Sequence, residues 1–169
     1  MSRKSRLWLL LGAFVIVLAI YVGLSYESYL PDERTAMKLE LKQAFPDLQL
    51  VTKQGEQADL KTFDNKQKVI FVVTTTCKVC NEQKDRFDSF AKHLQTKGVV
   101  PLVIYQDKEQ KSFKDFKNME DQFYLNASLK LSNVTPTTIW LDEENQVLEV
   151  DFGDYEGRRY VEKNFDFTY

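Results

Sequence analysis

The chain opens with an uninterrupted apolar run from Leu7 to Ser25 that contains no charged residue. Its length is about that of a helix that crosses a bilayer, which needs roughly 20 apolar residues. A cleaved signal peptide would have a shorter apolar core of about 7–15 residues followed by small residues, whereas tyrosines follow here. The pattern therefore predicts an uncleaved transmembrane anchor over residues 7–26, with a cleaved signal peptide or a buried core helix as the alternatives.

The residues around this run predict its orientation. Trp8 and Tyr26 stand at its two ends, and amphipathic aromatic rings favour the headgroup region of a membrane. Residues 1–6 contain basic side chains and no acid, and such a segment stays on the cytoplasmic side. We therefore expect a single-pass protein of the cell membrane whose remaining chain, from residue 27 onward, lies on the extracytoplasmic side.

A stalk helix is predicted over residues 27–47, between the anchor and a domain that covers residues 48–169. Pro31 can begin this helix, which runs to Phe45 with apolar residues on one side, and Pro46 ends it. The stretch that follows is extended and rich in turns. Its expected buried residues are Leu48, Leu50, Leu60 and Phe63.

Two buried strands joined by a helix are predicted next. The run of β-branched and aromatic residues from Val69 to Val73 is typical of a central strand that is buried on both faces. A helix follows as far as Thr96, Gly98 ends it, and a second apolar run spans residues 99–105. Strand, helix and strand make a βαβ unit.

The C-terminal part of the chain predicts a helix, a hairpin and a closing helix. Residues 109–120 carry apolar side chains at helical spacing, which we interpret as core. Residues 137–141 and 146–152 form two strands around a polar turn, and residues 155–165 can close the chain as a helix. Parallel strands followed by an antiparallel pair are the layout of an α/β, thioredoxin-like fold, with a central mixed sheet flanked by helices.

The charge of the chain argues against a nucleic-acid partner. The formal net charge is -2, and the part after residue 26 holds 20 basic against 25 acidic residues. Nucleic-acid binding needs concentrated lysine and arginine to neutralise phosphates.

The candidate chemistry lies in the two cysteines, Cys77 and Cys80, at the junction of the first buried strand and its helix. A Cys-x-x-Cys pair there favours redox chemistry, because a helix N-terminus stabilises a thiolate. Lys78 adds a nearby positive charge that would lower the thiol pKa. Helix phase places Cys80 on the apolar stripe, so we expect Cys80 to be the buried resolving thiol and Cys77 the accessible attacking thiol.

Two other uses of the cysteines compete with redox exchange. Zinc favours closely spaced cysteines but wants four ligands, and the chain's one histidine, His93, falls on the helix face opposite Cys80. We therefore interpret His93 as a surface residue and expect no metal. A purely structural disulfide suits an extracytoplasmic protein, but a bridge that closes so short a loop restricts the unfolded chain little.

Several segments together carry a family resemblance: Gly55 through Leu60, Val69 through Val73, Cys77-Lys78-Val79-Cys80 and Val134-Thr135-Pro136-Thr137-Thr138. They resemble the thioredoxin superfamily, and within it the membrane-anchored extracytoplasmic thiol-disulfide oxidoreductases related to cytochrome c maturation thioredoxins and to the thiol-peroxidase group. The resemblance covers residues 48–165. It implies that Pro136 is cis and lies against the cysteine pair, and that Thr135 and Pro136 bind an extended substrate segment through the Thr135 backbone.

The chain departs from the family pattern around the thiols. Relatives usually have an aromatic residue before the first cysteine and a proline or glycine between the two, where this chain has Thr76 and Lys78-Val79. Many relatives also have a buried carboxylate near the sulfurs, but the matching positions here are Phe71 and Gln83. The group that accepts the thiol proton is therefore not assigned.

The predicted function is dithiol/disulfide exchange with exported cysteine-containing proteins, leaning to reduction, with a membrane redox partner that resets the pair. Cues for direction conflict, since Lys78 favours an oxidant and Thr135 resembles the residue found in many reductases. No metal or organic cofactor is implied. The alternative is a non-catalytic, thioredoxin-like binding or accessory module for the export or maturation of a secreted peptide or protein.

Overall fold

The structure is a computed structural model that describes residues 14–18, 36–107, 116, 119, 121–126 and 130–153. The chain divides into two compact units, residues 1–33 and 34–169. In the first unit, residues 14–18 are helical with exposed side chains. Over the described ranges, no helix combines the length and the apolar character needed to cross a membrane. The other residues of the predicted anchor lie outside the described part.

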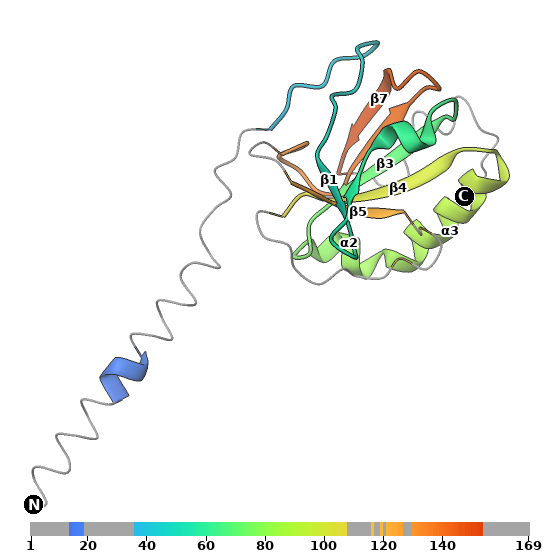
Figure 1. The fold of residues 1–169 in the computed structure, drawn as a ribbon. Coiled ribbons are helices and arrows are strands. Elements are labelled where there is room, and N and C mark those ends of the chain that lie inside the picture. Colours follow the sequence, from blue (N-terminus) through green and yellow to red (C-terminus); the bar gives the residue numbers. More distant parts are fainter. Residues whose placement is uncertain are drawn as a thin grey trace, which may run out of the picture. The chain divides into compact units, whose positions relative to one another are not determined.

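The second unit is built on a mixed sheet with seven strands among the described residues (Figure 1). Across the sheet the strands are β2 (Gln57–Ala58), β1 (Leu50–Thr52), β5 (Gln122–Leu125), β4 (Val100–Tyr105), β3 (Lys68–Val73), β6 (Thr137–Leu141) and β7 (Val147–Phe152). The described helices of this unit are the 3-10 helix η1 (Leu60–Phe63) and the α-helices α2 (Lys78–Glu82) and α3 (Lys84–Thr96). The predicted central mixed sheet is confirmed.

The predicted βαβ unit is confirmed at the centre of the sheet. β3 pairs in parallel with β4 along its whole length, from Lys68 opposite Val100 to Val73 opposite Tyr105. On its other side β3 pairs antiparallel with β6. All residues of β3 are buried, as expected for a strand covered on both faces. The C-terminal end of β3, after which the cysteines follow, is therefore held from both sides.

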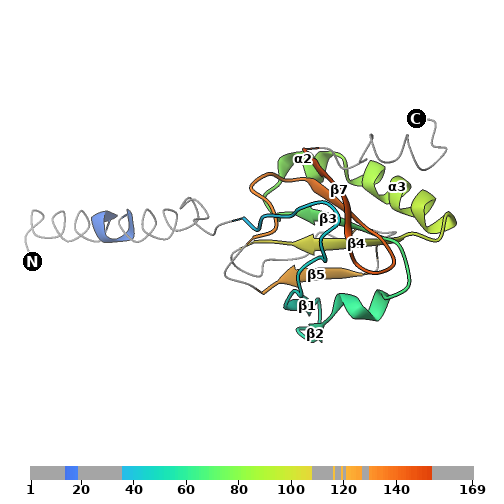
Figure 2. The ribbon, with the colours of Figure 1, turned by 90° about the horizontal axis from the view of Figure 1, so that it is seen from above.

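Helix α3 covers one face of the sheet (Figure 2). The buried side chains on its apolar stripe are Phe87, Phe90, Ala91 and Leu94. Phe71 of β3 meets the rings of Phe87 and Phe90 edge-on, with ring centroids 5.4 and 6.1 Å apart. Gly98 then turns the chain with a φ of 79°, which glycine adopts readily, so the predicted helix stop is confirmed.

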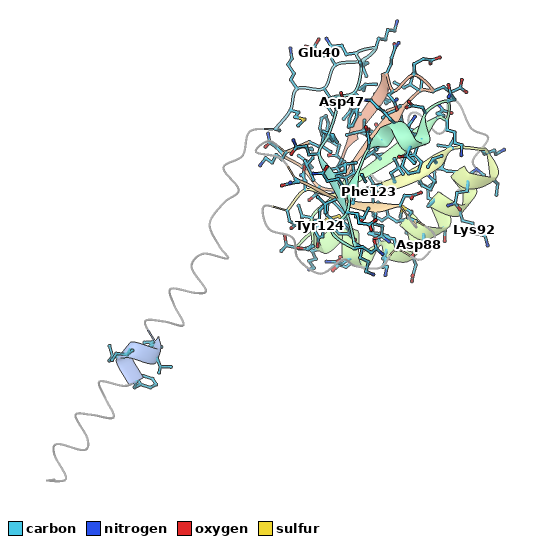
Figure 3. All side chains as sticks on the ribbon, in the orientation of Figure 1. Glu40, Asp47, Asp88, Lys92, Phe123 and Tyr124 are labelled. Carbon is cyan, nitrogen blue, oxygen red and sulfur yellow. A yellow bond between two sulfur atoms is a disulfide. The ribbon has the colours of Figure 1, made fainter. Side chains whose placement is uncertain are left out.

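The sequence pattern did not predict β5. Its neighbouring residues Phe123 and Tyr124, both labelled in Figure 3, pack into the apolar clusters on opposite faces of the sheet. Of the helix predicted just before β5, the described residues are Phe116 and Met119, and both are buried on the α3 side, as expected for core. The predicted closing helix of residues 155–165 lies outside the described part.

The predicted stalk helix is wrong for its described part, because residues 36–45 form a non-helical arm with a turn at residues 41–42. Ala36 bridges to Lys130 and Ala44 bridges to Gln146. These partners lie far along the chain, so the local spacing of apolar residues could not predict them. The first part of the predicted helix lies outside the described residues.

The arm covers the face of the sheet opposite α3. Met37 and Leu39 of the arm, and Leu48 shortly after it, pack against the apolar cluster on that face. Burial against this cluster outweighs the helical spacing, because helix propensity is only a weak preference. Of the residues expected to be buried nearby, Leu50 and Leu60 are buried, and Leu48 and Phe63 are half-buried.

The predicted hairpin is confirmed as β6 and β7. Asp142 shapes its turn, because the Oδ1 atom accepts hydrogen bonds from the N–H groups of Glu144 at 3.0 Å and Gln146 at 2.7 Å. The register places Val72 of β3 opposite Thr137 and Thr137 opposite Phe152. The start of β6 therefore lies at the same end of the sheet as the end of β3.

Lys68, at the opposite end of β3, is a fully buried cation with a relative exposure of 0%. Its Nζ donates a hydrogen bond to the Lys66 carbonyl at 2.7 Å. Burial lowers the pKa of Lys68 from 10.5, and nearby carboxylates, those of Asp64, Asp142, Glu143 and Glu144, act in the opposite direction. Burial prevails because a charged ammonium loses its hydration inside the fold.

We predict that Lys68 makes the free energy of unfolding rise at alkaline pH. Because its pKa is lowered in the folded state, the unfolded chain binds more protons between that lowered pKa and 10.5, and stability increases with pH across this window. In urea unfolding of the full chain, Lys68→Met should therefore gain stability over the wild type by more at about pH 8 than at about pH 10. The exposed Lys66→Met is the matched control. An equal difference at both pH values would contradict the prediction.

Candidate redox site

The two predicted cysteines are joined in a disulfide directly after the central strand. The S–S distance between Cys77 and Cys80 is 2.03 Å, and their Cα atoms are 5.3 Å apart. The Cys77 N–H donates to the Thr74 carbonyl at 3.1 Å, which fixes the turn between β3 and α2. The sulfurs belong to the α3-side cluster, whose members include Phe71 and Phe87.

The cysteine pair is asymmetric. Cys77 is the N-cap of α2, and its Sγ accepts a hydrogen bond from the Cys80 N–H at 3.1 Å. A donor aimed at this sulfur favours its thiolate once the disulfide is reduced. Cys80 is 3% exposed, so its predicted burial is confirmed. Cys77 is also buried, with 8% of the residue exposed, so the accessibility predicted for the attacking thiol is not seen in the disulfide form.

The helix after the cysteines is broken, whereas the sequence predicted one continuous helix. Gln83 separates α2 from α3 with a φ of -106° and a ψ of 16°. The break leaves α2 as a short helix that begins directly after Cys77. Gln83 is half-buried and Phe71 is in the core, so neither position where relatives have a carboxylate holds an acid here.

The Thr135–Pro136 peptide bond is cis, as the family resemblance implied. Pro136 comes directly before β6 and is buried, and its carbonyl accepts a hydrogen bond from the Gly153 N–H at 2.8 Å. The pairing of Val72 with Thr137 puts this proline and the disulfide at one end of the sheet. Across the ranges that the structure describes, the N–H and carbonyl of the half-buried Thr135 have no hydrogen-bond partner.

Sequence reasoning missed two polar residues of the site, Gln106 and Asp107. Both follow directly on β4, the parallel neighbour of β3, and each bonds to one of the two loops that form the site. The available signal was their position, because polar residues at the carboxyl end of a buried parallel strand lie where α/β proteins bind ligands.

A metal centre finds no support in the geometry. Within the described part of the chain, no three side chains of histidine, cysteine, aspartate or glutamate are grouped so that they could hold an ion. Both thiols are taken up by the disulfide. His93 is half-buried on α3, so its interpretation as a surface residue is only partly correct.

Comparison with known proteins identifies the family. The model of the AhpC/TSA family matches residues 41–155, which include the arm's end, the whole described sheet and both cysteines. The chain belongs to the AhpC/TSA family.

One relative resembles this AhpC/TSA family protein in sequence, and two solved structures resemble it in fold. Thioredoxin-like protein YneN of Bacillus subtilis (strain 168) is 26% identical over 155 residues, which are 85% of this chain and 89% of the relative. A thiol:disulfide interchange protein from Bacteroides sp. is 16% identical, with a TM-score of 0.61 over 78% of this chain and 94% of the other. The thioredoxin domain of a thiol-disulfide oxidoreductase from Bacteroides vulgatus is 17% identical, with a TM-score of 0.59 over 75% and 98%. The predicted thioredoxin-like fold is thereby confirmed.

Lys78 of this AhpC/TSA family protein is exposed and paired with a carboxylate. Its side chain is 85% exposed, and Nζ lies 3.7 Å from Oε1 of Glu82, one turn further along α2. Glu82 is exposed as well. Charges in water are screened, so this pair adds a weak field at Cys77. The pKa-lowering role of Lys78 stays a prediction.

We predict that Lys78 and Glu82 change the reactivity of Cys77 only slightly and in opposite directions. In the Cys80→Ser background, Lys78→Gln should lower the rate of iodoacetamide labelling at neutral pH by about two- to threefold at most, because exposed charges are screened. Glu82→Gln should raise that rate by a similar factor. A loss of tenfold or more in Lys78→Gln would show that Lys78 is a principal activator of the thiol.

Proposed function

We propose that this protein is a membrane-anchored, extracytoplasmic thiol-disulfide oxidoreductase that acts on exported cysteine-containing proteins. The observation that carries the proposal is the disulfide at the start of α2, with cis-Pro136 at the same end of the sheet. Family membership and the cysteine pair together support this chemistry. Thioredoxin-like folds also serve other functions, so it is the cysteine pair and its surroundings, and not the fold, that support this activity.

The exchange follows from the asymmetry of the two sulfurs. The Cys77 thiolate attacks a substrate disulfide, a Cys77–substrate bond forms, and the substrate S–S bond breaks with one sulfur leaving as a thiolate that takes up a proton. The Cys80 thiol then loses its proton and attacks the Cys77 sulfur. The Cys77–Cys80 bond forms again, the Cys77–substrate bond breaks, and the second substrate sulfur leaves as a thiolate that takes up a proton. Two electrons pass from the protein to the substrate, and the two protons taken up come from Cys80 and from solvent.

Thr135 supports the recognition of an extended substrate. Its backbone N–H and carbonyl have no partner in the described part of the fold, and they precede β6 at the end of the sheet where β3 leads to the disulfide. Unpaired peptide groups can bond to the backbone of an extended partner segment. A substrate segment paired with Thr135 would present its cysteine to Cys77.

The location of the protein rests on its N-terminal sequence. The uncharged run from Leu7 to Ser25 would anchor the chain, and the basic residues of positions 1–6 would stay inside. Exported proteins would then be the available substrates. A membrane redox partner would return electrons to the Cys77–Cys80 disulfide after each turnover.

We predict that Cys80→Ser traps partners and that Cys77→Ser does not. Without Cys80, the mixed disulfide on Cys77 cannot be released, so non-reducing gels of the full chain expressed in cells should show new high-mass species in the membrane fraction. Mass spectrometry should find exported proteins in them. Cys77→Ser is the matched control, since the buried Cys80 alone should trap little. Absence of adducts in both variants would favour the accessory-module alternative, and cytoplasmic partners would contradict the proposed location.

The proposed direction is reduction of partner disulfides. We predict a reduction potential near about -270 mV, the range of thioredoxin, when the full chain in detergent is equilibrated with glutathione. A value near about -120 mV would instead identify a donor of disulfides. Failure of the pair to cycle between the dithiol and the disulfide would contradict the enzyme itself.

A further inference from the structure

The two residues that follow β4 bond to the two separate loops of the redox site. Gln106 contacts the loop that leads to Thr135 and Pro136, and Asp107 contacts the turn that leads to Cys77. Both contacts are long-range, because the bonded residues are 26 and 32 positions apart in the sequence. One short segment therefore joins the nucleophile's loop to the loop that carries the substrate-pairing peptide.

The side-chain amide of Gln106 bonds to backbone groups of the loop before Pro136, as a neighbouring strand would. Its side chain is almost completely buried, with a residue exposure of 3%. The Nε2 atom donates to the Ser132 carbonyl at 2.8 Å, and Oε1 accepts from the N–H groups of Leu131 at 2.9 Å and Ser132 at 3.0 Å. The backbone N–H of Gln106 itself donates to the Val73 carbonyl at 3.0 Å, which ties this residue to the end of β3. The amide needs both its donor and its acceptor for these bonds.

Ser132 passes this constraint on to the cis-proline. Its Oγ accepts the Val134 N–H at 3.0 Å and lies 2.8 Å from Oγ1 of Thr137. The Thr137 hydroxyl also donates to the Val134 carbonyl at 2.7 Å. These bonds enclose Thr135 and Pro136 from both sides. The position of the Thr135 peptide groups therefore depends on Gln106 through Ser132.

Asp107 holds the other loop. Its Oδ2 accepts the Thr75 N–H at 2.8 Å, and its Oδ1 accepts the Thr75 hydroxyl at 3.0 Å. Thr75 is two residues before Cys77, and the Thr74 carbonyl accepts the Cys77 N–H. Both carboxylate oxygens are thus used to fix the turn that presents the attacking sulfur.

We propose that Gln106 and Asp107 are positioning residues that set where the Thr135 peptide lies relative to the Cys77 sulfur. The role rests on the proposed thiol-disulfide exchange. β4 is a suitable platform because it is paired on both sides and nearly all of its residues are buried. A site held by such a strand is more precise than one held by its loops alone, and a displacement of about 1 Å can cost on the order of 100-fold in rate.

The test compares the rate at which the protein reduces a protein disulfide with the rate at which it reduces a small-molecule disulfide. The reduced full chain in detergent is mixed with insulin, which should use backbone pairing, or with 5,5′-dithiobis(2-nitrobenzoic acid), which has no backbone to pair. Gln106→Met, of similar length but without the amide, should lower the rate with insulin by about tenfold or more and the rate with the small disulfide by less than about twofold. The exposed Gln43→Met is the matched control and should change neither rate.

The Asp107 loop has its own pair of variants. Asp107→Ala should lower both rates by about tenfold, because it frees the turn that carries the attacking sulfur. Asp107→Asn should restore most of the loss, since the amide oxygen can accept the Thr75 N–H and the amide nitrogen can donate to the Thr75 hydroxyl. Recovery by the uncharged residue would show that geometry, and not the charge of Asp107, is what matters.

The outcomes separate this proposal from the proposed function. If the wild type reacts with neither disulfide, the exchange activity fails and the positioning role fails with it. If the wild type reacts with both, but Gln106→Met lowers both rates equally or neither, the activity stands and the positioning role of Gln106 is overturned. Asp107→Asn as slow as Asp107→Ala would overturn the role of Asp107. Should Gln106→Met not fold, Gln106→Glu, which keeps the acceptor and loses the donor, must show the same selective loss.

Discussion

The parallel pairing of β3 with β4 is the constraint on which the redox site depends. β3 lies between β4 and β6, and its six residues are buried. Burial of a Val, Ile or Phe side chain stabilises the fold by about 1.5–3 kcal/mol, so displacing this strand would cost many such contributions. Because Cys77 follows within four residues of Val73, the position of β3 determines the position of the attacking sulfur. The end of β4 then fixes the loops on either side.

The two faces of the sheet differ in role, because only one of them carries the cysteines. The α3 side contains both sulfurs and a set of edge-on aromatic contacts, among them Phe71 with Phe87 and Phe90 with Trp140. The opposite side is covered by the arm, whose bridges reach Lys130 and Gln146. Lys130 directly precedes Leu131, which Gln106 binds. The arm and Gln106 therefore both bond to the segment that leads to the cis-proline, at neighbouring residues.

The sequence predicted those elements whose pattern lies in neighbouring residues, and it missed those that depend on distant partners. β3, β4 and the hairpin were predicted from continuous apolar runs and a polar turn. These patterns can be recognised within each segment, without knowledge of the segment that pairs with it. The helix over residues 36–45 was wrong because Ala36 and Ala44 pair with residues about a hundred positions away. β5 was missed because it has four residues and begins with a glutamine. Single hydrophobic residues in so short a strand carry little periodic signal.

The site shows the same division. Cys77 and Cys80 were found from their spacing and their place between a strand and a helix, and the family resemblance implied the cis bond before Pro136. The roles of Gln106 and Asp107 could not be predicted, because a polar dipeptide after a strand is common and only the fold brings Ser132 and Thr75 to it. Long-range side-chain to backbone bonds of this kind leave no periodicity in the sequence.

The hydrogen bond to the Cys77 sulfur and the exposure of Lys78 both bear on the proposed reductive direction. The difference between about -270 and about -120 mV corresponds to about 7 kcal/mol for a two-electron couple, and it arises when the thiolate form is strongly stabilised. The bond from the Cys80 N–H to the Cys77 sulfur is a hydrogen bond to a charged group after reduction, which contributes about 1.5–3 kcal/mol. Lys78 is too exposed, and too close to Glu82, to supply the remainder. Among the described residues, the Cys80 N–H stabilises the thiolate by less than a strongly oxidising couple requires, which agrees with the proposed reductive direction.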